Sequence, residues 1–293
     1  MAANASDGED WIRRVPEVVM STNRLHRVVD YEVPNLTVTV QAGVTVGELQ
    51  RTLAAGGSRL PLDPPFAAST LGGVVAANQS GPKRLAYGSA RDLVLGLRVV
   101  LPEGDTVRFG GKVMKNIAGF DMSKLFVGSW GTLGIITEIT LRVLPRPESE
   151  KTLLAAFSSL DDASRATGEI LASQLLPPAI ELVNPSAWDR VAGAALVGHP
   201  AASISRPGEG YLLVFGLEGF QEAVERQGTD VVSLCTRVGA WQTAALEGAP
   251  QGRLWSAIRD SSLLNRQTNP WTAGLKSRCR SHKWSASGRQ LRT

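Results

Sequence analysis

Three stretches of small residues carry the strongest chemical signal in this sequence. The first is STLGGVVAANQSG, residues 69–81; YGSARD follows at 87–92, and GSWGTLGIIT lies at 128–137. Glycine and hydroxyl residues let a backbone approach a ligand closely. The free N–H groups of such a backbone can bind a pyrophosphate or the edge of a planar ring. The sequence therefore predicts a binding site that is built largely from main chain.

Two common phosphate-binding patterns are absent from the sequence. No G-x-G-x-x-G follows a strand with an acidic residue about 20 positions further on, which excludes the Rossmann pattern. No Gly-Lys-Ser or Gly-Lys-Thr occurs, so there is no Walker A loop. A glycine in a turn is more often conformational than ligand-contacting, and this alternative stays open for each stretch taken alone.

The segment from LPLDPP at 60–65 to ITLRVLPRP at 139–147 resembles the second half of the FAD-binding domain of the vanillyl-alcohol-oxidase-like, or PCMH-type, flavoproteins. Within that family, VMKNIAGFDMSKLFVGSWGTLGIIT at 113–137 is most similar to the FAD-binding subunit of bacterial glycolate oxidase. The resemblance covers residues 18–147 well and residues 151–260 more loosely. The three stretches occur in family order, which favours ligand binding and implies FAD as the cofactor.

The resemblance also implies roles for single residues. Pro61 and Asp63 would lie on a loop that passes the flavin, and Tyr87 and Gly88 occupy the family's Tyr-Gly position. The main chain of Gly134, Ile135 and Ile136 would hold the adenine–ribose end. The wall along the pyrophosphate and the isoalloxazine would consist of Ser69, Thr70, Gly72, Gly73, Asn78, Ser80 and Gly81.

Four polar residues near these stretches are interpreted as structural. Arg91 and Asp92 could form an ion pair, and Lys115 and Asn116 could bond loop carbonyls. Polar loop residues usually serve to satisfy the backbone, so a catalytic role is the less favoured interpretation.

The three histidines, at positions 26, 199 and 282, lack the spacing of metal ligands. His26 and His199 are expected in solvated surface loops. Related flavoproteins that oxidise 2-hydroxy acids often use cap-domain histidines to hold the substrate and take its proton, and a general base must lie within reach of that proton. Residues 151–260 offer no such cluster. No catalytic residue and no metal ligand is therefore assigned.

Periodicity predicts an α+β chain. Strands are expected at 17–22 and 35–43 with a turn between them, and Thr45 with Glu48 three positions on starts a helix. The second half follows the order β-α-β-β-α-β of a ferredoxin-like fold, with its last helix interrupted near Gly228. The expected domains are a disordered lead-in at 1–14, an FAD-binding domain at 15–147, a ferredoxin-like cap at 151–260 and an irregular basic tail at 261–293.

The first residues do not match the opening of the family's FAD-binding domain. That domain starts with a strand, a helix, a second strand and a glycine-rich loop, whereas MAANASDGEDWIRR contains no such loop. The expected fold is therefore a PCMH-type FAD-binding domain lacking its first subdomain, followed by the cap. We expect a chain that is truncated at both ends relative to the family.

The charge distribution argues against nucleic acid as a partner. The formal charge is +4, but seven Lys and Arg residues and no acidic residue follow Asp260, and without those seven the charge is −3. A nucleic-acid-binding domain carries its charge on a folded face. Two cysteines form neither a disulfide framework nor a zinc site, and no signal peptide or transmembrane run is recognisable. A cytoplasmic protein is expected, with any membrane association arising through partners.

These observations lead to three functional hypotheses. The first is the FAD subunit of a glycolate oxidase complex, in which electrons from a small 2-hydroxy acid pass to an iron–sulfur subunit. The second is a non-catalytic FAD-binding or assembly subunit beside a catalytic FAD subunit, which the scarcity of histidines favours. The third is a stand-alone enzyme similar to D-lactate dehydrogenase. Any iron–sulfur centre must lie on a partner, because the chain has no cysteine cluster.

Overall fold

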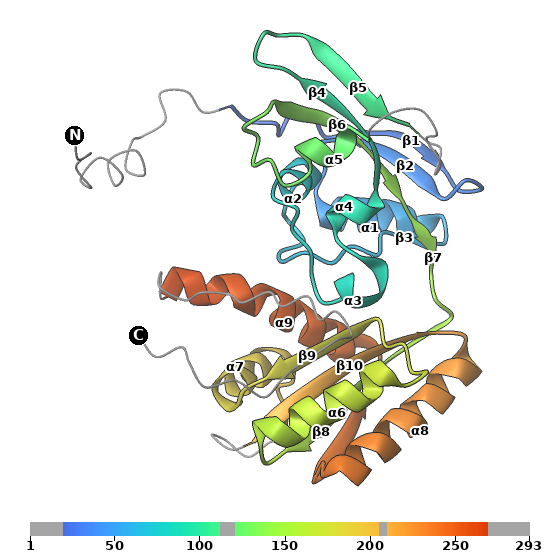
Figure 1. Cartoon of the computed structure of the whole chain (residues 1–293), viewed down its shortest axis with the longest axis vertical. Coiled ribbons are helices and arrows are strands. Elements are labelled where there is room, and N and C mark those ends of the chain that lie inside the picture. Colours follow the sequence, from blue (N-terminus) through green and yellow to red (C-terminus); the bar gives the residue numbers. More distant parts are fainter. Residues whose placement is uncertain (1–19, 112–120, 205–209, 269–293) are drawn as a thin grey trace, which may run out of the picture.

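The computed structural model of the chain describes residues 20–111, 121–204 and 210–268, with side chains described up to residue 261. Each half of the chain forms its own antiparallel sheet, and residues 146–148 join the two halves. The first domain lies above the second in Figure 1, with α9 and the short helix α3 near the junction. Within the described residues, no helix is both long and apolar enough to cross a bilayer.

The first sheet has five strands in the order β1-β2-β6-β4-β5, and every neighbouring pair is antiparallel. A two-stranded ribbon of β3 and β7 forms a separate small sheet. β-Branched residues dominate the central strands and fit a half-buried pleated surface. The strands are β1 (Val28–Glu32), β2 (Thr37–Gln41), β3 (Ser58–Arg59), β4 (Val94–Val100), β5 (Thr106–Gly110), β6 (Ile135–Arg142) and β7 (Leu144–Pro145).

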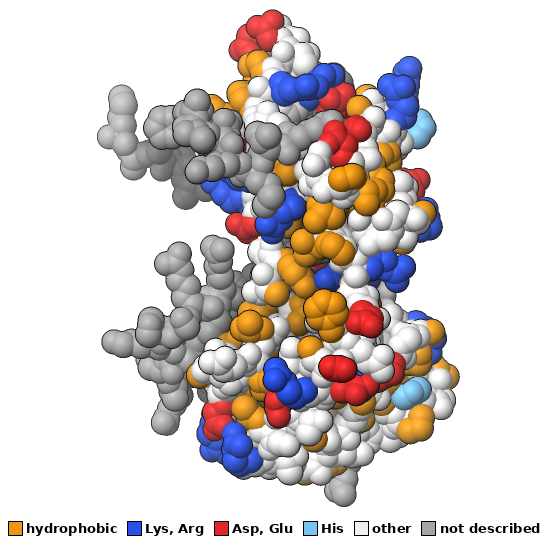
Figure 2. All heavy atoms as spheres, turned by 90° about the vertical axis from the view of Figure 1, so that its right-hand side faces the viewer, with side chains coloured by type: hydrophobic (Ala, Val, Ile, Leu, Met, Phe, Trp, Pro, Cys, Tyr) orange, Lys and Arg blue, Asp and Glu red, His pale blue; other side chains and the backbone are white. Residues whose placement is uncertain are grey.

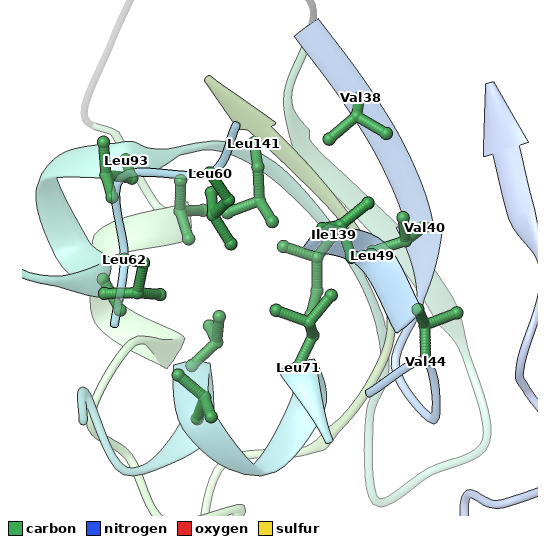
Figure 3. Packing of buried hydrophobic residues seen from close by; sticks show 14 of the residues in the cluster. Val38, Val40, Val44, Leu49, Leu60, Leu62, Leu71, Leu93, Ile139 and Leu141 are labelled. Atoms are coloured by element: carbon green, nitrogen blue, oxygen red, sulfur yellow. The ribbon is translucent and has the colours of Figure 1, made fainter. Parts of the chain in front are cut away.

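Helices cover the buried face of this sheet. Leu49 of α1, Leu71 of α2 and Ile139 of β6 are fully buried and lie in one cluster (Figure 3). The predicted capping box is present, because Thr45 and Glu48 each bond the other's backbone N–H at the start of α1. The helices are α1 (Val46–Ala55), α2 (Leu71–Ala76), α3 (Arg84–Tyr87), α4 (Ala90–Leu93) and α5 (Ser123–Phe126).

The second sheet has four antiparallel strands in the order β11-β8-β10-β9, which is the ferredoxin-like arrangement predicted for the cap. Helices α6 and α8 pack on one face, and α7 and α9 pack on the other. The elements are β8 (Ser149–Phe157), α6 (Leu160–Ala172), β9 (Ala179–Val183), α7 (Pro185–Ala195), a 3₁₀ turn (Pro200–Ser203), β10 (Tyr211–Gly219), α8 (Gln221–Val238), β11 (Gln242–Leu246) and α9 (Gly248–Thr268).

The strand register places three glutamates on one face of the cap sheet. Glu150 of β8 pairs directly with Glu218 of β10, and Glu181 of β9 pairs with Val214 of β10. Val214 lies in the core under α7 and α9, and Glu218 is two pleat repeats away on the same face. This is the face that meets the first domain.

Two cap helices differ from the sequence expectation. α8 is continuous through Gly228, which is buried against the sheet; a Cβ there would lie 3.8 Å from Leu217, an ordinary packing distance. α7 was not expected. It begins after Asn184, whose side chain accepts a hydrogen bond from the Ala187 N–H.

Residues 261–268 belong to α9, which runs to Thr268, and are not part of the irregular tail expected from residue 261. The sequence of α9 has little apolar periodicity, and packing supplies the stability instead. Leu254 is fully buried beneath the sheet, and the Trp255 indole N–H donates to Thr152 Oγ1 at 2.8 Å. α9 thus closes the face of the cap that meets the first domain.

Candidate functional site: a main-chain wall and a charged domain junction

Helix α2 is fixed directly to the strand that precedes α1. The N–H of Gly72 donates to Ala42 O at 2.7 Å, and a Cβ on Gly72 would lie 2.8 Å from Ala42 Cβ. The Thr70 hydroxyl accepts the N–H of Gly73 at 3.3 Å and so caps the helix. Gly72 is thus needed for packing, whereas Gly73 is exposed and a Cβ there would meet only its own cap. The backbone at Gly73 is therefore exposed, with no side chain of its own to cover it.

The glycine loop after α5 lies against the end of α2. The N–H of Gly128 donates to Val75 O at 3.1 Å, and that of Trp130 donates to Ala76 O at 2.9 Å. Between them, the Ser129 hydroxyl is buried and has no hydrogen-bond partner among the described residues. Buried hydroxyls are normally bonded, so this one is suited to a ligand atom. The first and third predicted stretches therefore form one surface.

The second stretch joins the same surface through side-chain hydrogen bonds. Asn78 has a φ of +46°, and its Oδ1 accepts the Arg91 N–H at 3.0 Å. The buried Ser80 Oγ accepts the Ala90 N–H at 3.2 Å. Ser69 donates from its hydroxyl to Pro65 O at 3.0 Å. These polar groups fix the loops of the wall.

Arg91 and Asp92 bond groups of the first domain, and Gly88, which the family pattern assigns to the cofactor, packs against Asp92. Asp92 accepts from both the N–H and the hydroxyl of Ser89, at 2.7 and 2.9 Å, and closes a capping box at α4. A Cβ on Gly88, whose φ is +79°, would collide with that carboxylate. Arg91 donates to Lys124 O at 2.6 Å. The predicted Lys115 and Asn116 lie outside the described residues.

Gly134, Ile135 and Ile136 begin strand β6 beside β4. Gly134 has a φ of +155°, and a Cβ there would lie 2.8 Å from Val100 O. Ile135 pairs with Val100, while Ile136 is buried and pairs with Val99. Sheet pairing fixes this backbone, so the conformational interpretation of Gly134 holds whether or not a ligand touches it.

Asp63 lies buried beneath the loop that starts at the buried Pro61. Its carboxylate accepts the Lys83 N–H at 3.2 and 3.3 Å, and a Cβ on Gly81 would lie only 1.7 Å from Asp63 O. Burial raises the pKa of Asp63 to about 6, against the opposing charge of Arg259. The loop of Asp63 and Gly81 are therefore in direct contact.

Glu218 joins the cap to the first domain. It accepts two hydrogen bonds from Arg59, both 2.6 Å long, one from Lys83 Nζ at 2.7 Å, and a short one from the Tyr87 hydroxyl. Burial opposes ionisation of Glu218, but these donors outweigh it and lower its pKa to about 2. Burial and Glu218 raise the pKa of Tyr87 to about 12. The Tyr87 hydroxyl therefore stays protonated and donates to Glu218 across the domain junction.

A second carboxylate of the cap faces the same junction. Among the described residues, the Glu181 side chain forms no hydrogen bond. Helix α3 of the first domain packs on its strand, β9. Burial raises its pKa to about 7, partly offset by Arg84 and increased by Asp63. Sequence reasoning missed Glu181 and Glu218. Each is a charged residue in an otherwise strongly apolar strand, AIELV for Glu181 and YLLVFGLEG for Glu218. That pattern could have identified them from the sequence.

The described histidines do not enter this junction. His26 is exposed and lies 3.2 Å from Arg24 O, while His199 accepts the Ala201 N–H at 3.2 Å as a cap. Within the described ranges, no group of three or more His, Cys, Asp or Glu side chains could hold a metal ion. Cys235 is buried, and burial raises the pKa of its thiol to about 12.

Two family models match this pair of domains. Residues 4–110 match the FAD binding domain, and residues 146–273 match the C-terminal domain of FAD linked oxidases. The chain belongs to the FAD-linked oxidase family. FAD is the cofactor of this family, and the exposed Gly73 backbone and the unpartnered Ser129 hydroxyl fit contact with such a group.

Curated relatives of this FAD-linked oxidase chain are glycolate oxidase subunits. It is 35% identical over 233 residues to subunit GlcD of Bacillus subtilis, covering 78% of this chain and 48% of that protein. It is 40% identical over 176 residues to subunit GlcE of Escherichia coli, covering 58% of this chain and 49% of that protein. The chain thus spans about half the length of these relatives.

Solved structures confirm the fold. Alkyldihydroxyacetonephosphate synthase superposes with a TM-score of 0.67 at 26% identity, over 84% of this chain and 46% of that one. p-Cresol methylhydroxylase superposes with a TM-score of 0.61 over 80% of this chain and 53% of that one; at 15% identity it shows the fold alone. The predicted PCMH-type architecture with a cap is correct.

Proposed function

We propose that this chain is an FAD-binding subunit of a glycolate-oxidase-type complex. The complex would oxidise glycolate or another small 2-hydroxy acid to the 2-oxo acid and pass the electrons to an iron–sulfur partner. The similarity to the GlcD and GlcE subunits carries this proposal, together with a two-domain arrangement in which the cap faces the cofactor domain. An FAD bound here supplies the acceptor for the two electrons of the CH–OH group.

The main-chain wall would hold the cofactor. Gly73 offers open backbone to a flat ring, Ser129 offers a hydroxyl, and Asn78 supports the loop that faces them. We propose as further cofactor contacts the remaining residues that the family pattern assigns: Pro61, Asp63, Ser69, Thr70, Gly72, Ser80, Gly81, Tyr87, Gly88, Gly134, Ile135 and Ile136.

The domain junction would orient the cap over the cofactor domain. Glu218 fixes the cap through Arg59 and Lys83, and these bonds set the distance between the cap sheet and the loop of Asp63. The raised pKa values, about 6 for Asp63 and about 7 for Glu181, leave Glu181 half protonated and Asp63 mostly ionised at neutral pH, so the junction carries less negative charge than two fully ionised carboxylates would where an anionic substrate must approach.

A second candidate is an assembly subunit that binds FAD but does not oxidise substrate itself. The positions of the histidines favour it, since His26 and His199 both lie in surface caps or turns away from the junction. A general base within reach of the substrate would then come from a partner subunit.

A visible spectrum of the purified chain separates the two candidates. Flavin bands that bleach when glycolate is added to the chain alone support catalysis by this subunit. Bands that bleach only after a partner FAD subunit and an iron–sulfur subunit are added support the assembly function. A chain that stays colourless after reconstitution with excess FAD contradicts both.

A further inference from the structure

A polar cavity of about 300 Å³ lies at the domain junction. It is bounded by the end of α1, the ribbon strand β3, the linker and α9. Figure 2 shows the side of the molecule that lies on the right in Figure 1. Charged side chains of both signs lie there near the narrow region between the two domains. The lining residues that carry charge are Arg59, Asp63, Lys83, Arg146, Glu150 and Arg259.

Cations outnumber anions in this lining. Four basic side chains face two acidic ones, and the four come from four separate segments of the chain. Glu218 lies behind the wall and neutralises part of the charge of Arg59 and Lys83. Arg146 is exposed on the linker, and its backbone N–H is bonded to Gly57 O at 2.9 Å, which fixes the position from which its side chain extends.

Arg59 has hydrogen-bonding capacity left over. Its two terminal nitrogens bond Glu218, but its Nε is buried and has no hydrogen-bond partner among the described residues. A guanidinium offers five donors in a fixed fork that fits planar carboxylate or tetrahedral phosphate oxygens.

We propose that the junction cavity binds a small oxyanion, a carboxylate or a phosphate, between the two domains. The cavity is at the lower end of the size range of ligand pockets, so it suits a molecule of a few heavy atoms. Arg59 and Lys83 come from the first domain and Arg259 from the cap, so the anion would contact both domains and the linker. This binding requires no flavin, so calorimetry tests it separately from the flavin spectrum that tests the proposed function.

The test is calorimetric titration of the full chain, at constant ionic strength, with potassium oxalate in one arm and inorganic phosphate in the other. We expect saturable binding in at least one arm. Arg146→Gln should weaken it about tenfold, because a charge-assisted hydrogen bond is lost. Glu150→Gln should tighten it about threefold, because a competing carboxylate is removed.

Arg108→Gln is the matched control, since Arg108 is an exposed arginine on β5 in the far sheet. It should leave the affinity unchanged. The arm that binds more tightly identifies the anion class. Absence of saturable binding in both arms overturns the proposal, as does an equal loss of affinity in Arg108→Gln and Arg146→Gln. If Arg146→Gln does not fold, the change in anion affinity of Glu150→Gln decides alone: tighter binding supports the proposal, and weaker or unchanged binding overturns it.

Discussion

Arg59 and Glu218 are 159 positions apart in the chain, yet they form a bidentate ion pair with two 2.6 Å hydrogen bonds across the domain junction. The Glu218 side chain is only 4% exposed and the Arg59 side chain 14% exposed. Because both side chains are buried away from water, each needs the opposite charge of the other to offset the cost of burying its own. The pair therefore governs how firmly the cap is attached.

Replacement of Glu218 by Gln should loosen the junction. The variant leaves Arg59 without its buried counter-charge, so the free energy of unfolding should fall by roughly 3 kcal/mol in urea titrations. Proteolysis should also become faster at residues 146–150. Glu247→Gln, which breaks an exposed pair with Lys151, should change stability by less than about 0.5 kcal/mol.

The effect of Glu218→Gln should depend on pH in a defined direction. The pKa of Glu218 is lowered from 4.5 to about 2 in the folded chain, so its stabilising contribution is present above pH 4.5 and is lost as the pH falls towards 2. The difference between variant and wild type should shrink over this range. A difference that stays constant down to pH 2.5 would contradict the assigned pKa.

Asp63→Asn should change the pH dependence with the opposite sign. The pKa of Asp63 is raised from 3.8 to about 6, so the associated stability is present below pH 3.8 and is lost as the pH rises through 6. Between pH 4.5 and 7.5, wild-type stability should fall by about 2 kcal/mol more than that of the variant. Parallel urea-stability curves would refute this, and Asp105→Asn in an exposed turn is the control.

Gly73→Ala tests the main-chain wall. Alanine favours helix, and its Cβ would meet only the Thr70 hydroxyl, at 3.3 Å, so the variant should fold about as stably as the wild type while its FAD affinity falls about tenfold or more. Gly72→Ala should instead unfold or destabilise the chain, because its Cβ would collide with Ala42. Fluorescence titration with FAD and thermal denaturation separate the two effects. An unchanged FAD affinity in Gly73→Ala would remove this residue from the site.

Ser129→Ala should weaken FAD binding without weakening the fold. The buried hydroxyl has no described partner, so its loss removes a desolvated polar group and should leave thermal stability equal or slightly higher. FAD affinity should drop about tenfold if the hydroxyl bonds the cofactor. Ser261→Ala is a suitable comparison, because that hydroxyl already donates to Ile258 O at 2.8 Å. A loss of stability in Ser129→Ala would indicate a structural role instead.

Local patterns were sufficient to predict much of the fold. The spacing of Thr45 and Glu48 defined the start of α1, and the order of strands and helices in the cap identified the ferredoxin-like sheet. β1 was misplaced. It occupies Val28–Glu32, inside the expected turn, because an exposed edge strand lacks the strong alternation of a half-buried one.

The site was only partly predictable for a physical reason. Small residues at 69–81 and 128–134 are contiguous signals, and the structure brings these segments together at α2. The contact of Tyr87 with Glu218 was not predictable, because Glu218 reaches it only after the two domains dock, and the Arg59 partner lies 28 positions away in the chain. Similarly, Ser129 is informative only through the lack of a partner, which no sequence pattern records.

The pairing of Glu150 with Glu218 on neighbouring strands has a consequence for how the chain folds. Two carboxylates directly opposite each other repel, so the cap sheet by itself holds an electrostatic strain between its two central strands, at the start of β8 and the end of β10. Arg59 and Lys83 relieve it, and both are synthesised before either glutamate. The positive side chains of the first domain are thus already present when the last cap strands are synthesised, and they offset the repulsion between the two glutamates.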